Sequence, residues 1–225
     1  KFIEDLDYTN RISHMLASET ALNIADKINS KKAIKSLSTI SEAIHKDTVY
    51  ITVVDKDRMA VSLIYSIFHS FGSGIASNKY GILFQNRGAG FTLEQDHPNE
   101  LAGGKRPMHT IIPGMLAERG RVTMPFGVMG GGYQPKGHAR LLSNMLDFDL
   151  NIQEAIDGPR SFYENGVLKL ERGYVSNVRQ QLVEMGHKVQ IPRGPIGGAQ
   201  AIMIGENGVL TGASDPRKDG CALGY

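Results

Sequence analysis

"DTVYITVVDKDRMAVSLIYS", residues 47–66, is the stretch that decides the fold of this chain. Its side chains alternate from Thr48 to Asp55, which is the pattern of a half-buried strand. The charged turn "DKDR" follows and a second apolar run begins at Met59, so we expect strands at 49–54 and 59–66 joined as a hairpin. The Ser- and Lys-rich residues 29–47 indicate a linker, so Asp47-Thr48 lies where a flexible segment meets a fixed strand.

The rest of the chain mixes helical and strand patterns and contains no internal repeat. Helices are expected over 18–28, with Ser18 as the N-cap, over 134–148, from Asn151 with a capping box to Glu154, and around 175–185. Strands are expected at 80–84, 121–129, 199–205 and 209–213, the last two joined through a tight turn at 206–208. This order predicts an α+β fold in which helices pack on sheets.

The composition is that of an ordinary globular protein and excludes several functional classes. The formal net charge is only +2 over 225 residues, and no basic run with interleaved aromatic residues predicts nucleic-acid binding. No apolar run is long enough to span a membrane. The single Cys221 excludes an internal disulfide framework and a cysteine-based zinc site. It also favours a reducing compartment, so we expect a cytoplasmic rather than a periplasmic or extracellular location.

Three familiar catalytic or binding patterns are absent. The "GSG" at 72–74 lacks the G-x-S-x-G spacing of a serine hydrolase. The seven histidines are scattered without metal-ligand spacing, so we expect no metal and no cofactor. Gly130, Gly131 and Gly132 precede a helix as a phosphate-binding loop would, but the G-K-[ST] of such a loop is missing.

An N-terminal threonine is a different kind of nucleophile. The flexible linker before Thr48 would permit the cleavage that makes Thr48 such a residue. The α-amine of such a threonine acts as its general base, so no histidine is needed. The chain must first be cut just before the threonine. From the pattern alone, Thr48 is equally an ordinary residue that opens a strand, because threonine has a high strand propensity.

Five dispersed motifs follow one another along the chain: "DTVYITVVDKD", "FGSGI", "YGILF", "GKRP" and the C-terminal "GASDPRKDGCALGY". Together, and in this order, they resemble the gamma-glutamyltranspeptidase family of N-terminal nucleophile hydrolases. The resemblance implies a precursor that cleaves itself and folds as a four-layer αββα sandwich. It further implies that residues 1–47 are the C-terminal end of a large subunit and that 48–225 are the small catalytic subunit.

The same resemblance assigns roles to individual residues. Thr48 corresponds to the nucleophile, Asp47-Thr48 to the cleaved bond and Ser66 to the hydroxyl residue that hydrogen-bonds the nucleophile. Gly130 and Gly131 correspond to the paired glycines whose N–H groups form the oxyanion hole. The implied chemistry is attack of Thr48 on an amide carbonyl, with the oxyanion held by backbone donors.

The chain departs from the family where gamma-glutamyl enzymes hold the glutamate. It carries Phe68 for an asparagine, Arg87 for an amide, Gly90 for an aspartate, and His109-Thr110 for two serines. Loss of the acidic residue and gain of a guanidinium predict a carboxylate-bearing acyl group in place of an ammonium group. Together with "GGGYQPKGH", these departures resemble the oxamate amidohydrolase and acylase-like branch. His138 within that motif is expected to be structural.

Three interpretations follow. The first is an autoprocessing amide hydrolase or acyl transferase acting on a small acidic amide. The second is a true gamma-glutamyl transferase or glutathione hydrolase, and the third is an uncleaved, non-catalytic homologue that serves as a binding module. We expect the partner to be a large subunit from the same precursor, giving a heterodimer or a dimer of heterodimers, without nucleic acid or membrane.

Overall fold

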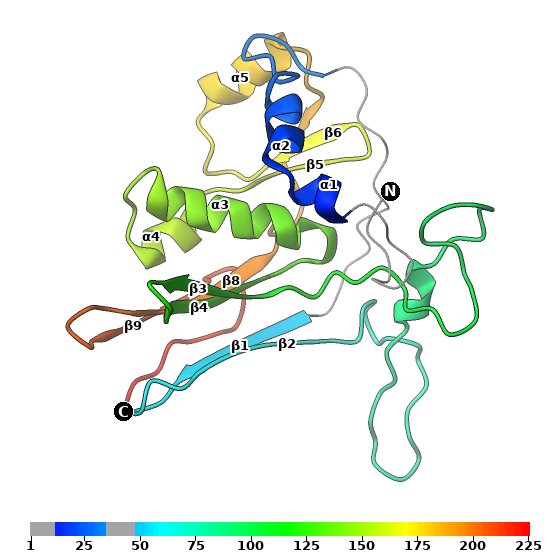
Figure 1. The fold of residues 1–225 in the computed structure, drawn as a ribbon. Helices are drawn as coiled ribbons and strands as arrows, with labels where there is room; N and C mark the ends of the chain where they lie inside the picture. Colours follow the sequence, from blue (N-terminus) through cyan, green and yellow to red (C-terminus); the bar gives the residue numbers. More distant parts are fainter. Residues whose placement is uncertain (1–11, 35–47) are drawn as a thin grey trace.

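The computed structural model describes residues 12–34 and 48–225 of the chain (Figure 1). Residues 35–47 of the linker predicted at 29–47, including Asp47, lie outside the described residues. The described part is an α+β fold with three antiparallel or mixed sheets and helices packed on one of them. No described helix has the length and apolar character needed to cross a membrane.

The opening hairpin forms as the alternating pattern predicts. Strands β1 (Thr48–Val54) and β2 (Ala60–Ser66) pair antiparallel in one unbroken register, from Thr48 opposite Ser66 to Val54 opposite Ala60. Asp55 fixes the turn, because its Oδ1 accepts hydrogen bonds from the N–H groups of Asp57 and Met59 at 2.9 and 2.8 Å.

A four-stranded antiparallel sheet forms the centre of the molecule in the order β3-β4-β8-β9. Its strands are β3 (Pro113–Glu118), β4 (Arg121–Met129), β8 (Gly198–Ile204) and β9 (Leu210–Ser214). Three of them confirm the sequence prediction, whereas β3 was not expected. Its burial alternates only weakly, and it pairs with β4 through a register shift between Leu116 and Ala117.

The predicted strand at 80–84 is wrong. Residues 70–86 form a projecting ribbon. Its two arms are joined by an isolated bridge between Ala76 and Leu83 and by backbone hydrogen bonds of Phe84 with Ser73 and Ile75 and of Ser77 with Ile82, but neither arm is a continuous strand. Gly81 takes a positive φ of 65°, and Ile82 and Phe84 remain exposed. An apolar run forms a stable strand only where a neighbouring strand and a packing face are available, and among the described residues this segment has neither.

Helices α3 (Gln134–Leu146) and α4 (Ile152–Asp157) cover one face of the four-stranded sheet (Figure 1). The main core lies between these layers and includes Met124, Val128, Leu141 and Ile156. The predicted capping box is confirmed, because Asn151 accepts from the N–H of Glu154 while Glu154 accepts from the N–H of Asn151.

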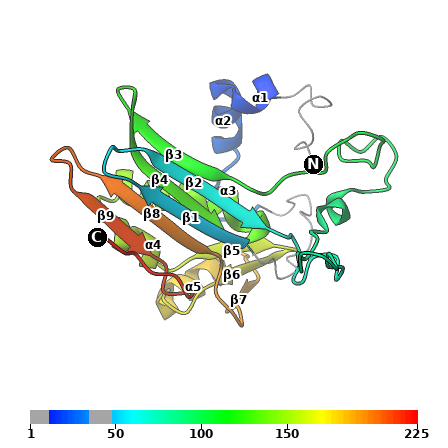
Figure 2. The same cartoon turned by 90° about the horizontal axis from the view of Figure 1, so that it is seen from below.

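The β1–β2 hairpin covers the opposite face of that sheet (Figures 1 and 2). Its inward residues pack closely: a Cβ on Gly127 would lie 2.3 Å from the Tyr50 ring, so only glycine fits beneath it. The outward residues are apolar yet exposed, at 44–62 %: Val49, Ile51, Val53, Val61, Leu63 and Tyr65. The described residues therefore supply three layers of a sandwich, with an apolar face on the outer side of the hairpin.

The remaining elements form a smaller unit beside the sandwich. Strands β5 (Ser161–Glu164), β6 (Val167–Leu170) and β7 (Val189–Gln190) make a three-stranded sheet, and α5 (Ser176–Glu184) precedes β7. The N-terminal helices are α1 (Ile12–Leu16) and α2 (Ser18–Ala25). The expected cap at Ser18 is wrong: Ala17 is the N-cap and makes no side-chain cap, while Ser18 lies within the first turn.

Candidate active site

The topology brings Thr48, Ser66 and the glycine turn to one end of the stacked sheets. Arg58, in the β1–β2 turn, donates a hydrogen bond to the carbonyl of Gly208 in the β8–β9 turn, so these two turns share one end. The start of β1 and the end of β2 therefore lie at the other end. There β8 begins, with Gly198 paired to Met129 at the end of β4 (Figure 2).

Thr48 and Ser66 form the central contact of the site. Thr48 Oγ1 donates a hydrogen bond of 3.1 Å to Ser66 Oγ, and both side chains are half-buried. Ser66 Oγ also accepts from the N–H of Phe68 at 3.1 Å. The Phe68 φ is 77°, so the chain turns sharply after Ser66 and points that N–H back at the hydroxyl. This pair is in direct contact, as the sequence assignment required.

The glycine turn follows immediately after β4. Gly130 and Gly131 have φ of 126° and 57°, values that glycine adopts at low cost and that residues with side chains rarely adopt. A Cβ on Gly130 would lie 2.9 Å from the Cα of Gly197, so the two backbones touch. The short 3-10 helix η2 (Gly131–Tyr133) then leads into α3. Two successive peptide N–H groups at such a turn can donate to an oxyanion.

A buried guanidinium lies beyond Ser66. Arg87 belongs to the 3-10 helix η1 (Arg87–Gly90) and is only 5 % exposed. Its Nη1 donates to Thr110 Oγ1 at 3.1 Å, and its Cζ lies 4.9 Å from the centre of the Phe68 ring. Nη2 is buried and has no hydrogen-bond partner among the described residues. Burial lowers the pKa of Arg87, and no ion pair to this guanidinium occurs within the described part of the chain.

The surroundings of Arg87 are positive. A Cβ on Gly90 would make only ordinary contacts, 3.9 Å from the Phe68 ring. His109 is exposed next to the buried Thr110, and desolvation together with the charges of Arg87 and Arg106 lowers the pKa of His109. The structure therefore brings together Phe68, Arg87, Gly90 and Thr110 as one cluster, which joins Thr48 through the Ser66–Phe68 hydrogen bond.

The side chain of His138 hydrogen-bonds to the backbone of β4 and is not part of this cluster. Its Nε2 accepts a hydrogen bond from the N–H of Val128 at 3.3 Å, and its ring lies 4.9 Å from that of Phe126. Burial lowers the pKa of His138 and so favours the neutral ring that this acceptor role requires.

A buried ion network, to which the sequence analysis gave no role, holds the C-terminal segment against β8. Asp215 is 1 % exposed, pairs with Arg160 and Arg217, and accepts from the N–H of Ala199 at 2.7 Å. Arg217 also pairs with Glu171 at 2.8 Å. Partners so distant in sequence give no local signal, although the run "SDPR" shows that charged residues cluster there.

The described residues contain no group of three or more His, Cys, Asp and Glu side chains that could hold a metal. The site so far comprises a hydroxyl pair, a glycine turn and a buried cation. An arrangement of this kind can perform nucleophilic acyl transfer on a substrate with an anionic acyl group. Asp47, the expected residue before the cut, is outside the part of the chain that the structure describes.

Comparison with known sequences gives a consistent result. The sequence profile described as gamma-glutamyltranspeptidase matches residues 1–225. The chain is 37% identical over 193 residues to a glutathione hydrolase-like YwrD proenzyme of Bacillus subtilis, with 82% of this chain and 37% of the relative covered. It is 39% identical over 188 residues to an oxamate amidohydrolase proenzyme of Klebsiella pneumoniae, covering 80% and 36%. The chain thus spans little more than a third of these relatives.

Solved structures share the fold. A cephalosporin acylase from Bacillus halodurans superimposes with a TM-score of 0.87 at 35% identity, covering 100% of this chain and 42% of that chain. A gamma-glutamyltranspeptidase from Pseudomonas nitroreducens, complexed with L-DON, gives a TM-score of 0.73 at 25% identity, covering 78% of this chain and 98% of that chain. The α+β prediction is confirmed, and the arrangement is that of the N-terminal nucleophile hydrolases in this group.

Proposed function

The chain belongs to the gamma-glutamyltranspeptidase family, and from this membership we propose that it carries the nucleophile of an autoprocessing amide hydrolase or acyl transferase. The observation that carries the proposal is the hydrogen bond from Thr48 Oγ1 to Ser66 Oγ at the first residue of β1. Cleavage between Asp47 and Thr48 would make a rigidly held threonine the new N-terminus. The two fragments would be residues 1–47, as the end of a large subunit, and 48–225, as the small subunit.

The mechanism follows from the groups at this end of the sheets. The freed α-amine of Thr48 takes the proton of its own hydroxyl, and Oγ1 attacks the amide carbonyl. N–H groups of Gly130 and Gly131 hold the oxyanion, a contribution of roughly 3–4 kcal/mol for one such donor. The C–N bond then breaks, the amine leaves with the proton, and the acyl group remains on Thr48. Water or an acceptor amine attacks this ester and restores the hydroxyl.

Arg87 defines the acyl group. The guanidinium of Arg87 is buried, its Nη2 has no hydrogen-bond partner, and it has no acidic neighbour among the described residues. A carboxylate of the substrate would supply both the missing counter-charge and the missing acceptor. Phe68 and Thr110 hold the guanidinium plane in place, and Gly90 places no side chain against the Phe68 ring. We therefore propose a small amide whose acyl part bears a carboxylate. A gamma-glutamyl group would bring its ammonium into this positive cluster, which makes it the second candidate.

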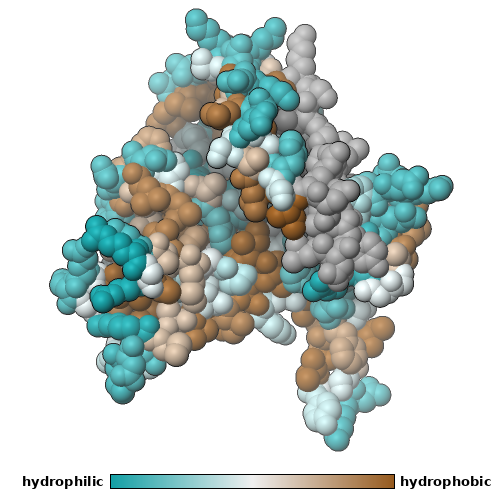
Figure 3. Space-filling model, in the orientation of Figure 1, coloured by the Kyte–Doolittle hydropathy of each residue, from teal (hydrophilic) through white to brown (hydrophobic). Residues whose placement is uncertain are grey.

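The exposed apolar surfaces support a partner of considerable size. The outer face of the hairpin is apolar along both strands, and the ribbon at 70–86 exposes Phe71, Ile75, Ile82 and Phe84. Figure 3 shows this ribbon as a largely apolar projection with a hydrophilic tip. We propose that the large subunit of the same precursor covers these surfaces and supplies the fourth layer, as a heterodimer or a dimer of heterodimers.

The coverage of one solved structure supports the proposed cut. The Pseudomonas transpeptidase chain is matched over 98% of its length by 78% of this chain. Residues 48–225 make up 178 of the 225 residues, which is a similar share.

Intact-mass measurement of the full-length protein tests the proposal. Wild type is expected to separate into two polypeptides at Asp47–Thr48, whereas Thr48→Ala stays whole and Thr48→Ser is cut. Ammonia release from oxamate should then exceed amine release from a gamma-glutamyl anilide. Absence of cleavage in the wild type would establish an uncleaved homologue acting as a binding module. A preference for the anilide would favour the gamma-glutamyl transferase.

A further inference from the structure

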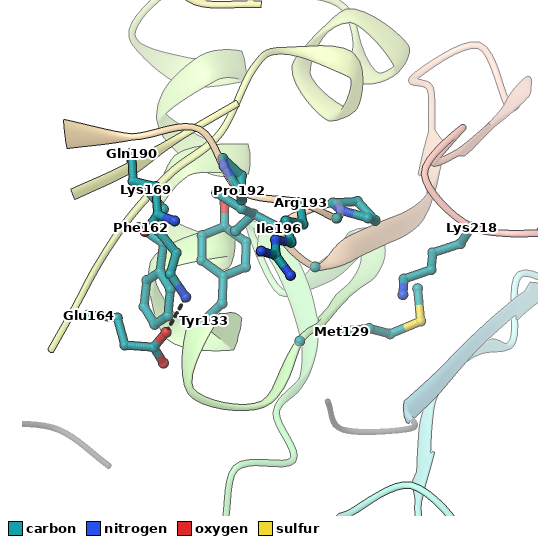
Figure 4. Close-up of a pocket in the computed structure, with 14 residues that line it drawn as sticks. Met129, Tyr133, Phe162, Glu164, Lys169, Gln190, Pro192, Arg193, Ile196 and Lys218 are labelled. Carbon is teal, nitrogen blue, oxygen red and sulfur yellow. Dashed lines mark hydrogen bonds and ion pairs between the residues drawn. The ribbon is translucent and has the colours of Figure 1, made fainter. Parts of the chain in front are cut away.

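A pocket opens beside the glycine turn. Its volume is about 440 Å³, within the usual range for small-molecule sites. It is formed by the β5–β6 hairpin, the segment between β7 and β8, and Lys218 near the C-terminus (Figure 4). Gly130, assigned above to the oxyanion, is one of its lining residues.

The charge of this pocket is positive. Among its lining residues, Glu164 and Lys169 form an ion pair at 2.6 Å and neutralise each other. Arg193 and Lys218 form no side-chain hydrogen bond or ion pair with the described residues, and both are exposed. In Figure 4 the Arg193 side chain lies near Ile196 and Tyr133, and the Lys218 side chain lies near Met129. Arg193 and Lys218 are therefore available to bind an anion.

Most of the other lining residues are apolar or aromatic. Phe162 and Tyr133 meet edge to face at 5.6 Å between ring centres, and Pro192, Pro195 and Ile196 line the same cavity. The Tyr133 hydroxyl is buried without a hydrogen-bond partner among the described residues. Figure 4 shows the hydroxyl end of this ring directed toward Pro192 within the lining. The pocket thus combines an apolar, partly aromatic lining with two exposed cations, and the Tyr133 hydroxyl is buried behind that lining.

Met129 relates the pocket to β1, the strand that begins with Thr48. Met129 lines the pocket and belongs to the same buried cluster as Tyr50, which lies two residues after Thr48 on the inward face of β1. Gly198 packs against both Lys218 and Met129, because a Cβ on this residue would be 2.5 Å from the Lys218 side chain and 3.1 Å from Met129 Cε. Arg87 reaches Thr48 by the separate route through Ser66 and Phe68. Strand β1 therefore adjoins the pocket through Met129, and Thr48 adjoins the Arg87 cluster through Ser66 and Phe68.

We infer that this pocket binds the amine part of the substrate, and that this amine carries an apolar body and an anionic group such as a carboxylate. The inference rests on the proposed function, in which Arg87 holds the acyl part. The amide C–N bond breaks between the two sites, the acyl group stays on Thr48, and the protonated amine departs into the pocket. An ammonia-releasing amide would leave the apolar lining and both cations without a ligand.

Kinetics with three oxalyl amides test the inference on the processed full-length protein. Oxamate releases ammonia, N-oxalyl-L-phenylalanine releases an amine with an apolar body and a carboxylate, and N-oxalylphenethylamine lacks that carboxylate. Wild type should show the highest kcat/KM for the phenylalanine derivative. The double variant Arg193→Gln, Lys218→Gln should lower that value about tenfold, the usual loss for a charge-assisted hydrogen bond. Its kcat/KM for oxamate should change by less than about twofold.

The matched control is Lys188→Gln, an exposed cation that directly precedes β7 and does not line the pocket. It should leave all three substrates unaffected. Equal losses for oxamate and the phenylalanine derivative in the double variant, or no wild-type preference for the carboxylate, would overturn the inference.

Equilibrium binding separates this inference from the proposed function. L-Phenylalanine should bind the wild type more tightly than phenethylamine, and the double variant should lose that difference. If the protein hydrolyses none of the amides, the proposed function fails, and binding that depends on Arg193 and Lys218 would still establish the pocket. If hydrolysis depends on Thr48 but phenylalanine binding is unchanged in the double variant, the pocket inference alone fails.

Discussion

Thr48 Oγ1 donates a 3.1 Å hydrogen bond to Ser66 Oγ across the last pair of the β1–β2 register. The two residues are eighteen positions apart in sequence and directly opposite in the hairpin, so the pairing itself sets their distance. Ser66 is in turn held by the N–H of Phe68, which leaves its hydroxyl one defined orientation toward Thr48.

Ser66→Ala removes the acceptor of the Thr48 hydroxyl and should slow both cleavage of the precursor and amide turnover. We expect kcat to fall by about 10–100-fold, the scale of one lost hydrogen bond where charge develops. The control is Ser62→Ala on the same face of β2, where Ser62 donates to the carbonyl of Gly114 at 2.9 Å. That change should lower thermal stability and spare cleavage. Equal effects of both variants on the cleavage half-life would contradict a specific role of Ser66.

Arg87→Gln removes the buried cation proposed to hold the acyl carboxylate. For an acyl group with a carboxylate, KM should rise about tenfold or more, because a charge-assisted pair is lost. Arg87→Lys should restore only part of the affinity, since an ammonium lacks the planar fork. Arg119→Gln, on an exposed side chain in the β3–β4 turn, serves as the charge-matched control. An unchanged KM in Arg87→Gln would remove Arg87 from the acyl site.

His138 should give the protein an acid-sensitive component of stability. Its pKa is lowered in the folded state, so the unfolded chain binds the proton more readily. The neutral His138 ring therefore contributes to folding stability at pH values above the pKa of the unfolded chain, about 6.5. This contribution is lost as the pH falls from there toward the lowered pKa of the folded state. Thermal melts from pH 7.5 to 5 should show a decreasing Tm. His138→Gln should flatten that decrease, whereas His187→Gln, on a half-buried side chain outside the core, should retain it.

Asp215→Asn should destabilise the protein strongly. The substitution leaves Arg160, at 5 % exposure, without its buried counter-charge, which typically costs about 3–5 kcal/mol. Asp57→Asn breaks an ion pair whose side chains are 86% and 72% exposed and should change stability by less than about 1 kcal/mol. Denaturant unfolding of the two variants measures the difference, and similar midpoints would show that the network does not contribute.

Much of the fold could be predicted because the patterns are local. Alternation predicted β1 and β2, the Asn151–Glu154 spacing predicted α4, and a tight turn at 206–208 predicted the β8–β9 hairpin. The prediction failed at 80–84, where an apolar run has no neighbouring strand among the described residues, and at β3, whose pairing depends on β4. A strand forms only where another strand pairs with it, and the sequence of one strand does not identify its partner.

By itself the sequence determined the hairpin, the residue types at its ends and the likeness of Thr48, Ser66 and Gly130-Gly131 to a nucleophile site. Only the tertiary structure decided that Arg87 is buried against Phe68 and Thr110 and that its Nη2 has no hydrogen-bond partner among the described residues. It alone also decided that Arg193 and Lys218 line a pocket beside Gly130. The physical reason is that burial and charge pairing depend on segments distant in sequence meeting at one end of a sheet. Side-chain periodicity records which face a residue occupies, but not which distant residue lies opposite it.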